Sequence, residues 1–175
     1  MSHQPSTPDA PRHLVVMGVS GVGKSTVAEL LRARLGFELA EGDDFHPPAN
    51  VEKMSAGVPL QDADRWPWLR ALADWARERH ADGRSTVMTC SALKRDYRDV
   101  LREGVPNTFF VHLVGNPSLL LERMARRRHF MPPSLLESQF ETLQRLDAGE
   151  DGMEVEVTAT PDEIVEKVVQ ELGLP

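Results

Sequence analysis

Eight residues, GVSGVGKS from Gly18 to Ser25, constrain the fold of this chain more than any other stretch. A continuous apolar run, 13–17, precedes them, and a segment with helical spacing of its apolar residues, 24–35, follows. Glycines let a backbone fold tightly around phosphate oxygens, and the loop amides and the next helix N-terminus supply oriented positive charge. The pattern therefore predicts a buried strand, a phosphate-binding turn and a helix, in that order.

The rest of the chain alternates strand-like and helix-like segments. Further strands are expected at 37–40, 85–90, 108–114 and 153–157, and helices at 92–103 and within 47–82. Gly36 is placed to end the first helix, and Asn116, Ser134 and Thr160 are placed to begin later ones. Such alternation predicts a parallel sheet, with the apolar–acidic repeat at 153–157 on its edge.

Length and composition indicate one domain, 13–175, after a polar, proline-rich tail, 1–12, that we expect to be disordered. With one cysteine, Cys90, no intrachain disulfide can form. The net charge of −7 argues against a general nucleic-acid or membrane binder. No apolar run approaches a membrane span or a signal peptide, so we expect a cytoplasmic protein. The sequence leaves open whether the protein forms a homodimer.

The phosphate-binding turn predicts a nucleoside triphosphate ligand with Mg²⁺. Lys24 should reach the β- and γ-phosphates, and Ser25 should ligate the metal. A regulatory GTPase would carry N-K-x-D and D-x-x-G motifs, and a motor ATPase would carry a strand ending in a carboxylate; neither pattern is present. A small kinase fits what remains. The expected phosphate-binding residues are Gly18, Ser20, Gly21, Val22, Gly23, Lys24, Ser25 and Thr26.

Over residues 13–173 the chain closely resembles the bacterial-type gluconate kinases, relatives of shikimate and nucleoside monophosphate kinases. The resemblance rests on five blocks in order: MGVSGVGKST, GDDFHP, NVEKMSAGVPLQDADRWPWL, CSALKRDYRDVLR and HFMPPSLLESQFETLQ. It implies a three-layer α/β P-loop fold with a mostly parallel five-stranded sheet and a helical lid at about 123–133. It also implies transfer of the γ-phosphoryl group of ATP to the 6-hydroxyl of D-gluconate.

The second block supplies the expected acceptor residue. An aspartate of related kinases contacts the acceptor hydroxyl, and it corresponds to Asp43, which would orient the hydroxyl and take its proton. Asp44 is the competing candidate, because neighbouring side chains on an extended segment point in opposite directions. His46, Asn50 and Lys53 are expected substrate contacts, although His46 and Asn50 could equally cap the helix that they precede.

Arginines are the expected receptors of the gluconate carboxylate, because a guanidinium binds a carboxylate with two hydrogen bonds. Arg65 is the first candidate and Arg98 the second. An internal ion pair of Arg65 with Asp62 or Asp64 is the structural alternative. Lys94 could contact a phosphate or simply carry surface charge.

The segment RMARRRHF, 123–130, is expected to be the lid. Arg123 and Arg127 are four residues apart on a helix and should close over the triphosphate, with Arg127 catalytic. The segment is one residue shorter than in the gluconate kinases that the chain resembles, so Arg126 or Arg128 could face the phosphates in place of Arg127. His129 is an expected substrate contact, and the loop 158–161 should lie against the adenine.

Two other functions stay open at this point. One is phosphorylation of shikimate or another polyol acid on the same fold, and the other is a nucleotide-binding regulator without an acceptor. The phosphate-binding turn, the acceptor-side aspartate and the lid together favour a kinase over the regulator.

Overall fold

The computed structural model describes residues 10–126 and 133–175. The predicted contacts Arg127 and His129, and Arg128 with them, lie outside these residues. Within them the elements are β1 His13–Met17, α1 Lys24–Leu35, β2 Glu38–Glu41, the 3₁₀ helix η1 Gly42–Phe45, α2 Pro48–Ser55, α3 Asp62–Ala81, β3 Thr86–Thr89, α4 Arg95–Arg102, β4 Thr108–Val114, α5 Pro117–Arg126, α6 Pro133–Thr142, β5 Gly152–Glu156 and α7 Pro161–Leu172.

The five strands form one sheet in the order β2-β3-β1-β4-β5, and every neighbouring pair is parallel. The continuous apolar run of β1 is buried along its whole length, at the centre of the sheet. Its last residue, Met17, lies opposite His112 of β4, and Val16 lies opposite Thr89 of β3. The predicted parallel sheet is confirmed, and so is the place of the acidic strand β5 at an edge.

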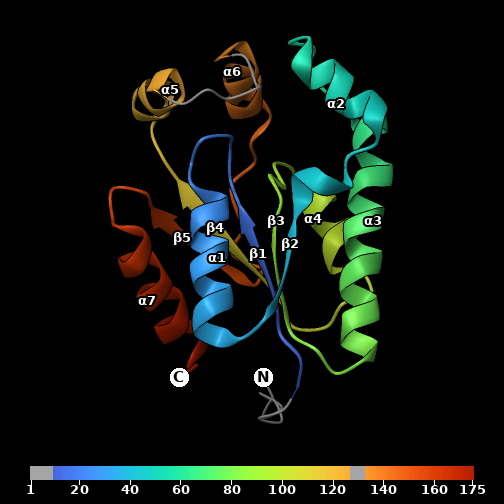
Figure 1. Ribbon diagram of the computed structural model, residues 1–175, viewed down its shortest axis with the longest axis vertical. Helices are drawn as coiled ribbons and strands as arrows, with labels where there is room; N and C mark the ends of the chain where they lie inside the picture. Colours follow the sequence, from blue (N-terminus) through green and yellow to red (C-terminus); the bar gives the residue numbers. More distant parts are fainter. Residues whose placement is uncertain (1–9, 127–132) are drawn as a thin grey trace.

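Helices cover both faces of the sheet (Figure 1). Helices α1 and α7 pack together on one face, and α3 and α4 pack together on the other. Side chains from each layer, among them Val16, Leu31, Leu72 and Phe110, are completely buried between them. This is the three-layer arrangement that the sequence predicts. Among the described residues, no helix combines the length and apolarity needed to cross a membrane.

Three further helices stand beyond the carboxyl ends of the strands. In Figure 1, α5 and α6 lie above one side of the sheet and α2 lies above the other. Open parallel sheets bind ligands outside the carboxyl ends of their strands, so this is the edge where a site is expected.

Most of the predicted helix boundaries agree with the structure, and two differ. Ser134, expected to cap the helix now labelled α6, lies inside it, because α6 begins at Pro133 and proline is favoured in the first turn of a helix. Helix α1 ends at Gly36, which takes the left-handed conformation, and Thr160 caps α7 in a reciprocal pair of hydrogen bonds with Glu163. The helix expected at 92–103 begins instead at Arg95. Ala92 has a positive φ of 47°, which turns the chain before the helix can start. The stretch 47–82 holds two helices, α2 and α3.

Candidate active site

The turn between β1 and α1 forms a cradle at the N-terminus of α1. Gly18 has a φ of 146°, and a Cβ there would lie 2.8 Å from the carbonyl oxygen of Leu113, so glycine is required. The Nζ of Lys24 donates to the carbonyl oxygens of Gly18 at 2.9 Å and Val19 at 3.1 Å. Burial lowers the pKa of Lys24, while the nearby Asp43 and Glu41 act to raise it. A concave backbone with a lysine amine across it suits an anion.

The end of β2 meets the end of β3 through a cluster of oxygen atoms. Oε2 of Glu41 accepts hydrogen bonds from Ser25 Oγ at 3.0 Å and from Thr89 Oγ1 at 2.7 Å. A Cβ at Gly42 would lie 2.0 Å from the carbonyl oxygen of Thr89, so a larger residue could not follow Glu41. The indole of Trp68 donates to the carbonyl of Gly42 at 2.7 Å and holds the turn in place. The turn therefore delivers the next residue, Asp43, to the edge of the sheet.

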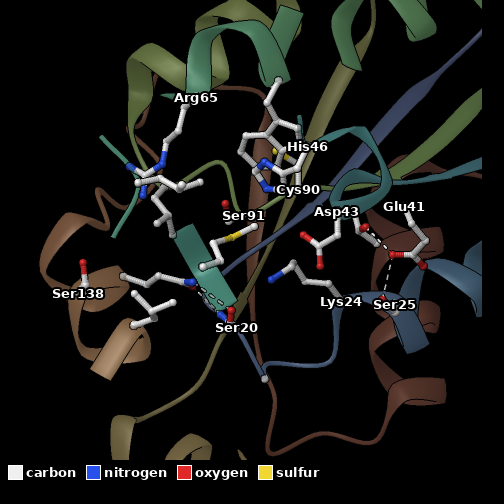
Figure 2. Close-up of a pocket in the computed structure, with 18 of the residues that line it drawn as sticks. Ser20, Lys24, Ser25, Glu41, Asp43, His46, Arg65, Cys90, Ser91 and Ser138 are labelled. Carbon is white, nitrogen blue, oxygen red and sulfur yellow. Dashed lines mark hydrogen bonds between the residues drawn. The ribbon is translucent and has the colours of Figure 1, made fainter. Parts of the chain in front are cut away.

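Asp43 and Asp44 lie in a 3₁₀ helix, not in the extended segment that the sequence suggested. Their side chains still diverge, because successive residues of such a helix are about a third of a turn apart. Asp43 lines a cavity beside the phosphate-binding turn, and Figure 2 shows its carboxylate directed toward Lys24. Asp44 is exposed and is not among the residues that line this cavity.

The cavity has a volume of about 160 Å³ and lies between the phosphate-binding turn, α3 and α6. It brings together ten of the predicted site residues: Ser20, Gly21, Gly23, Lys24, Ser25, Thr26, Asp43, His46, Arg65 and Arg123. The sequence reasoning assigned no role to several other wall residues, namely Glu41, Trp68, Thr89, Cys90, Ser138 and Gln139. Burial raises the pKa of the Cys90 thiol to about 12, so this cysteine is not a nucleophile at neutral pH.

His46 faces the cavity as a neutral imidazole. Its ring stacks on Trp68, with the ring centroids 4.0 Å apart. Burial and the charge of Arg65 lower its pKa to about 4, against a smaller opposing effect of Asp43. The amide nitrogen of Asn50 lies 3.3 Å from His46 Nδ1 and donates to the carbonyl of Asp64 at 2.8 Å, which fixes the orientation of the amide. Nδ1 is then the acceptor, and the ring proton sits on Nε2.

Three residues that the sequence predicted to contact substrate make their contacts within the protein. Asn50 is buried and ties α2 to α3 through His46 and Asp64. Lys53 pairs with both carboxylate oxygens of Asp64 at 2.9 Å, and Lys94 pairs with Asp62 at 3.1 Å. None of the three is among the cavity wall residues. Their expected contacts with substrate stay predictions. Val22 and Gly18, expected at the phosphates, are likewise not among the residues that line the cavity.

Arg65 of α3 lines the cavity. Its Nη1 donates to the hydroxyl of Tyr97 at 2.6 Å, and its guanidinium lies over the Tyr97 ring. The hydroxyl in turn donates to Asp62. The carboxylates that could have neutralised Arg65 are engaged elsewhere, Asp62 by Lys94 and Tyr97, and Asp64 by Lys53. Tyr97, which the sequence reasoning missed, therefore orients the arginine.

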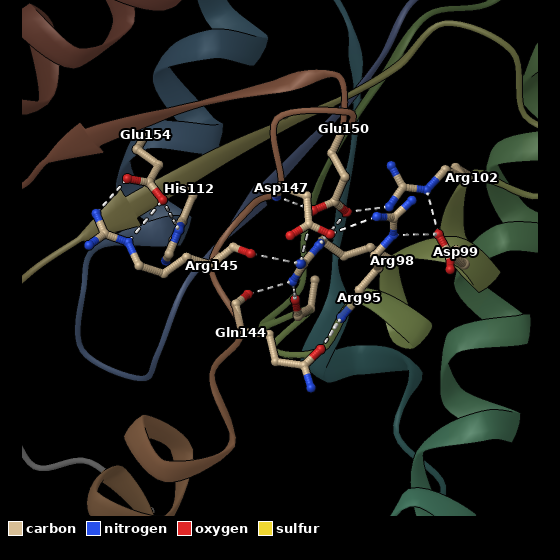
Figure 3. A network of polar contacts seen from close by, with 11 residues as sticks. Arg95, Arg98, Asp99, Arg102, His112, Gln144, Arg145, Asp147, Glu150 and Glu154 are labelled. Carbon is tan, nitrogen blue, oxygen red and sulfur yellow. Dashed lines mark hydrogen bonds and ion pairs between the residues drawn. The ribbon is translucent and has the colours of Figure 1, made fainter.

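Arg98 is not part of this site, and its predicted contact with substrate is wrong. Its side chain is completely buried, and it forms an ion pair with the equally buried Glu150 at 2.8 Å. Its remaining N–H groups donate to the carbonyls of Ala92, Gln144 and Arg145 and to the second oxygen of Glu150 (Figure 3). All five donors of the guanidinium are used. It has none left for a ligand.

Arg123 of α5 also lines the cavity. Its Nη2 donates to the carbonyl of Val157 at 3.3 Å, directly before the loop 158–161 that the sequence assigns to adenine. Arg123 thus lies on the cavity wall beside that loop.

The oxygen cluster of Ser25, Glu41 and Thr89 fits the requirements of Mg²⁺. Among the described residues, no group of three or more His, Cys, Asp or Glu side chains could hold a metal. Mg²⁺ does not need such a cage, because it usually takes one or two protein oxygens and completes its shell with phosphates and water. Ser25 and Glu41 supply those oxygens next to the phosphate-binding turn.

Comparison with known proteins agrees with this geometry. Residues 14–146 match the model of a family described as AAA domain. A gluconokinase of Gluconobacter oxydans is 51% identical over 161 residues, which cover 91% of this chain and 90% of the relative. Among solved structures, a sugar kinase from Janibacter has a TM-score of 0.91 at 49% identity, covering 94% of this chain and 95% of the other. A gluconokinase from Sinorhizobium meliloti has a TM-score of 0.84 at 46% identity, covering 94% and 93%. The chain belongs to the gluconokinase family of P-loop kinases.

Proposed function

We propose that this protein transfers the γ-phosphoryl group of ATP to the 6-hydroxyl of D-gluconate, giving 6-phosphogluconate and ADP. The observation that carries the proposal is one cavity with Lys24 and Asp43 at one end and the guanidinium of Arg65 at the other. A phosphate donor, a hydroxyl and a carboxylate can therefore be held in one place, which suits a sugar acid.

On the donor side, the amides of the turn and Lys24 would hold the β- and γ-phosphates. Arg123 and the loop 158–161 would lie near the base and ribose. Ser25 and Glu41 would hold Mg²⁺, which would offset the negative charge of the phosphates. Arg127 and His129 remain proposals from the sequence.

On the acceptor side, Asp43 would accept a hydrogen bond from the 6-hydroxyl and align its oxygen with the γ-phosphorus. The bond from that oxygen to phosphorus forms as the bond from phosphorus to the β–γ bridging oxygen breaks, and the hydroxyl proton passes to Asp43. The Nε2–H of His46 would donate to an acceptor hydroxyl, because the neutral ring carries its proton there.

Arg65 would bind the carboxylate of gluconate. Of the two buried arginines compared above, it is the one that lines the cavity. A carboxylate held by a guanidinium gains strength from its charge and from paired geometry. The same contact would select acids over uncharged polyols.

A direct test is ADP release by the purified protein with ATP and Mg²⁺, with and without D-gluconate, and with shikimate and D-sorbitol as other acceptors. We expect strong dependence on gluconate. ADP release that ignores every acceptor would support a nucleotide-binding regulator, and release driven by shikimate would change the substrate. Asp43→Asn should lower turnover by roughly 10²–10⁴-fold, whereas the matched control Asp44→Asn should stay near wild type. The reverse ranking would exchange the two assignments.

A further inference from the structure

Gln139 of α6 holds the phosphate-binding turn by two complementary hydrogen bonds. Its Oε1 accepts from the backbone N–H of Ser20 at 2.7 Å, and its Nε2 donates to Ser20 Oγ at 3.0 Å. Both residues line the cavity, Gln139 on α6 and Ser20 on the turn. We propose that Gln139 is a positioning residue that fixes the phosphate-binding turn in its nucleotide-receiving shape. The inference rests on the proposed kinase function, and it adds a residue to which that function assigns no role.

The chemistry of an amide fits this position. Ser20 offers a backbone donor and a hydroxyl, and glutamine meets them with one acceptor and one donor at the required separation. A lysine or arginine could not accept from the N–H, and a carboxylate would put a further negative charge beside bound phosphates. Asparagine is one methylene shorter than glutamine and could not span the same gap.

The glycines of the phosphate-binding turn explain why a contact that restricts it is useful. Two residues with positive φ, Gly21 at 82° and Gly23 at 99°, follow Ser20. Glycines reach these angles without strain, but they also give a free chain more conformations to lose when it becomes ordered. A contact at Ser20 restricts the turn at its tip, before a nucleotide arrives.

The base of α6 is itself fixed, so Gln139 projects from a defined position. The N–H of Gln144 donates to the carbonyl of Leu93 at 2.6 Å, and the N–H of Arg95 donates to Gln144 Oε1 at 3.0 Å. The buried guanidinium of Arg98 donates to the carbonyl of Gln144 at 3.0 Å. Figure 3 shows Gln144 in contact with both Arg95 and Arg98. The buried ion pair therefore anchors the chain that leads back, through α6, to the phosphate-binding turn.

The contact supports phosphate binding without competing for it. Ser20 was expected among the phosphate-binding residues, but Gln139 engages its amide, which leaves the amides from Gly21 into α1 to face phosphates. A site that is already ordered loses less entropy when a ligand binds, so it binds more tightly. Loss of Gln139 should therefore weaken nucleotide binding more than it weakens the fold.

The test is calorimetric titration of a non-hydrolysable ATP analogue with Mg²⁺, without gluconate, into wild type, Gln139→Met and the control Glu141→Gln. Methionine keeps the length of the side chain and removes both hydrogen bonds; Glu141 is exposed on the same helix. We expect the dissociation constant to rise about tenfold in Gln139→Met and to stay within about twofold in the control. The KM for ATP should rise similarly, while the KM for gluconate should change little.

Two further variants separate positioning from packing. Ser20→Ala removes one of the two bonds, so in that background Gln139→Met should have a smaller effect than in wild type. Gln139→Glu can keep both contacts but adds charge, so its weaker binding should be partly restored by salt. Analogue binding by Gln139→Met within twofold of wild type would overturn the proposal. A wild-type protein that binds the analogue but shows no gluconate-dependent ADP release would instead refute the proposed function alone.

Discussion

Arg65 and Arg98 are both buried arginines on helices of the same layer, yet their surroundings give them opposite tasks. In the described part of the chain, Arg65 makes one hydrogen bond, to Tyr97, and lines the cavity. Arg98 has all five of its donors engaged by protein, and it faces the carboxylate of Glu150. An arginine is available to a ligand when the protein orients it and leaves donors unused. An arginine whose donors are all used is part of the framework.

The largest effect should come from Arg98→Met, measured as the free energy of unfolding in denaturant. Removing the guanidinium leaves Glu150 buried with reduced compensation, although Arg102 still contacts it. Breaking one side of a buried ion pair costs about 3–5 kcal/mol. Arg95→Met, on the same helix, breaks the exposed pair with Asp147 and should cost at most about 1 kcal/mol. Equal losses in the two variants would contradict the framework role of Arg98.

Arg65→Ala should leave stability nearly unchanged and raise the KM for gluconate by roughly ten- to a hundredfold, since a charge-assisted contact contributes about 1.5–3 kcal/mol. The KM for ATP should move little. Arg70→Ala, an exposed arginine of the same helix, is the matched control. Steady-state kinetics with each substrate varied in turn would show the difference, and a parallel rise in both KM values would argue against a carboxylate receptor.

Tyr97→Phe should raise the KM for gluconate by less than Arg65→Ala does. The variant keeps the ring under Arg65 but removes the hydroxyl that accepts its hydrogen bond and donates to Asp62. One such bond is worth about 0.5–1.5 kcal/mol, so we expect a two- to tenfold higher KM for gluconate. In the Arg65→Ala background the substitution should add almost nothing. If Tyr97→Phe raised the KM for gluconate as much in the Arg65→Ala background as in wild type, Tyr97 would act independently of Arg65.

The free energy of unfolding should also depend on pH, in two ranges that meet near pH 4. The pKa of His46, near Arg65, is lowered to about 4, so the unfolded chain binds more protons below pH 6.5 and stability falls between about pH 6.5 and 4. His13, with a pKa also lowered to about 4, contributes to the same window. Burial acts to raise the pKa of Glu150, but hydrogen bonds from Arg98 and its neighbours lower it to about 2. Its contribution is therefore lost between about pH 4.5 and 2. In His46→Gln, the free energy of unfolding should depend less steeply on pH between about 6.5 and 4. Its loss between about pH 4.5 and 2 should be unchanged.

The sequence predicted the fold and the turn between β1 and α1 well, because their signals are local. The phosphate-binding turn and α1 were predicted from the glycine spacing, the apolar strand before it and the helix caps. Gly36 caps the end of α1 and Thr160 caps the start of α7, as predicted. The start of α4 was missed, because the turn at Ala92 depends on its carbonyl being bound by Arg98, six residues later.

The acceptor side was harder to predict, because its roles depend on contacts between distant segments. Nothing in the spacing of Arg65 and Arg98 reveals that the second faces Glu150, 52 residues away. Tyr97 and Gln139 carried no signal of their own, since a tyrosine and an amide inside helices are common. The sequence likewise does not show that Asn50 and Lys53 share a partner, Asp64, which belongs to the next helix.

In the proposed reaction, Arg65 holds the carboxylate of the acceptor while Asp43 receives the proton of its hydroxyl. The most direct test is the ratio of kcat/KM for D-gluconate to kcat/KM for D-sorbitol, which has a hydroxymethyl group where gluconate has its carboxylate. We predict that Arg65→Ala lowers this ratio by roughly ten- to a hundredfold relative to wild type, mainly through loss of activity on gluconate. A ratio unchanged by the substitution would contradict the account, because the preference for an acid would then arise elsewhere in the molecule.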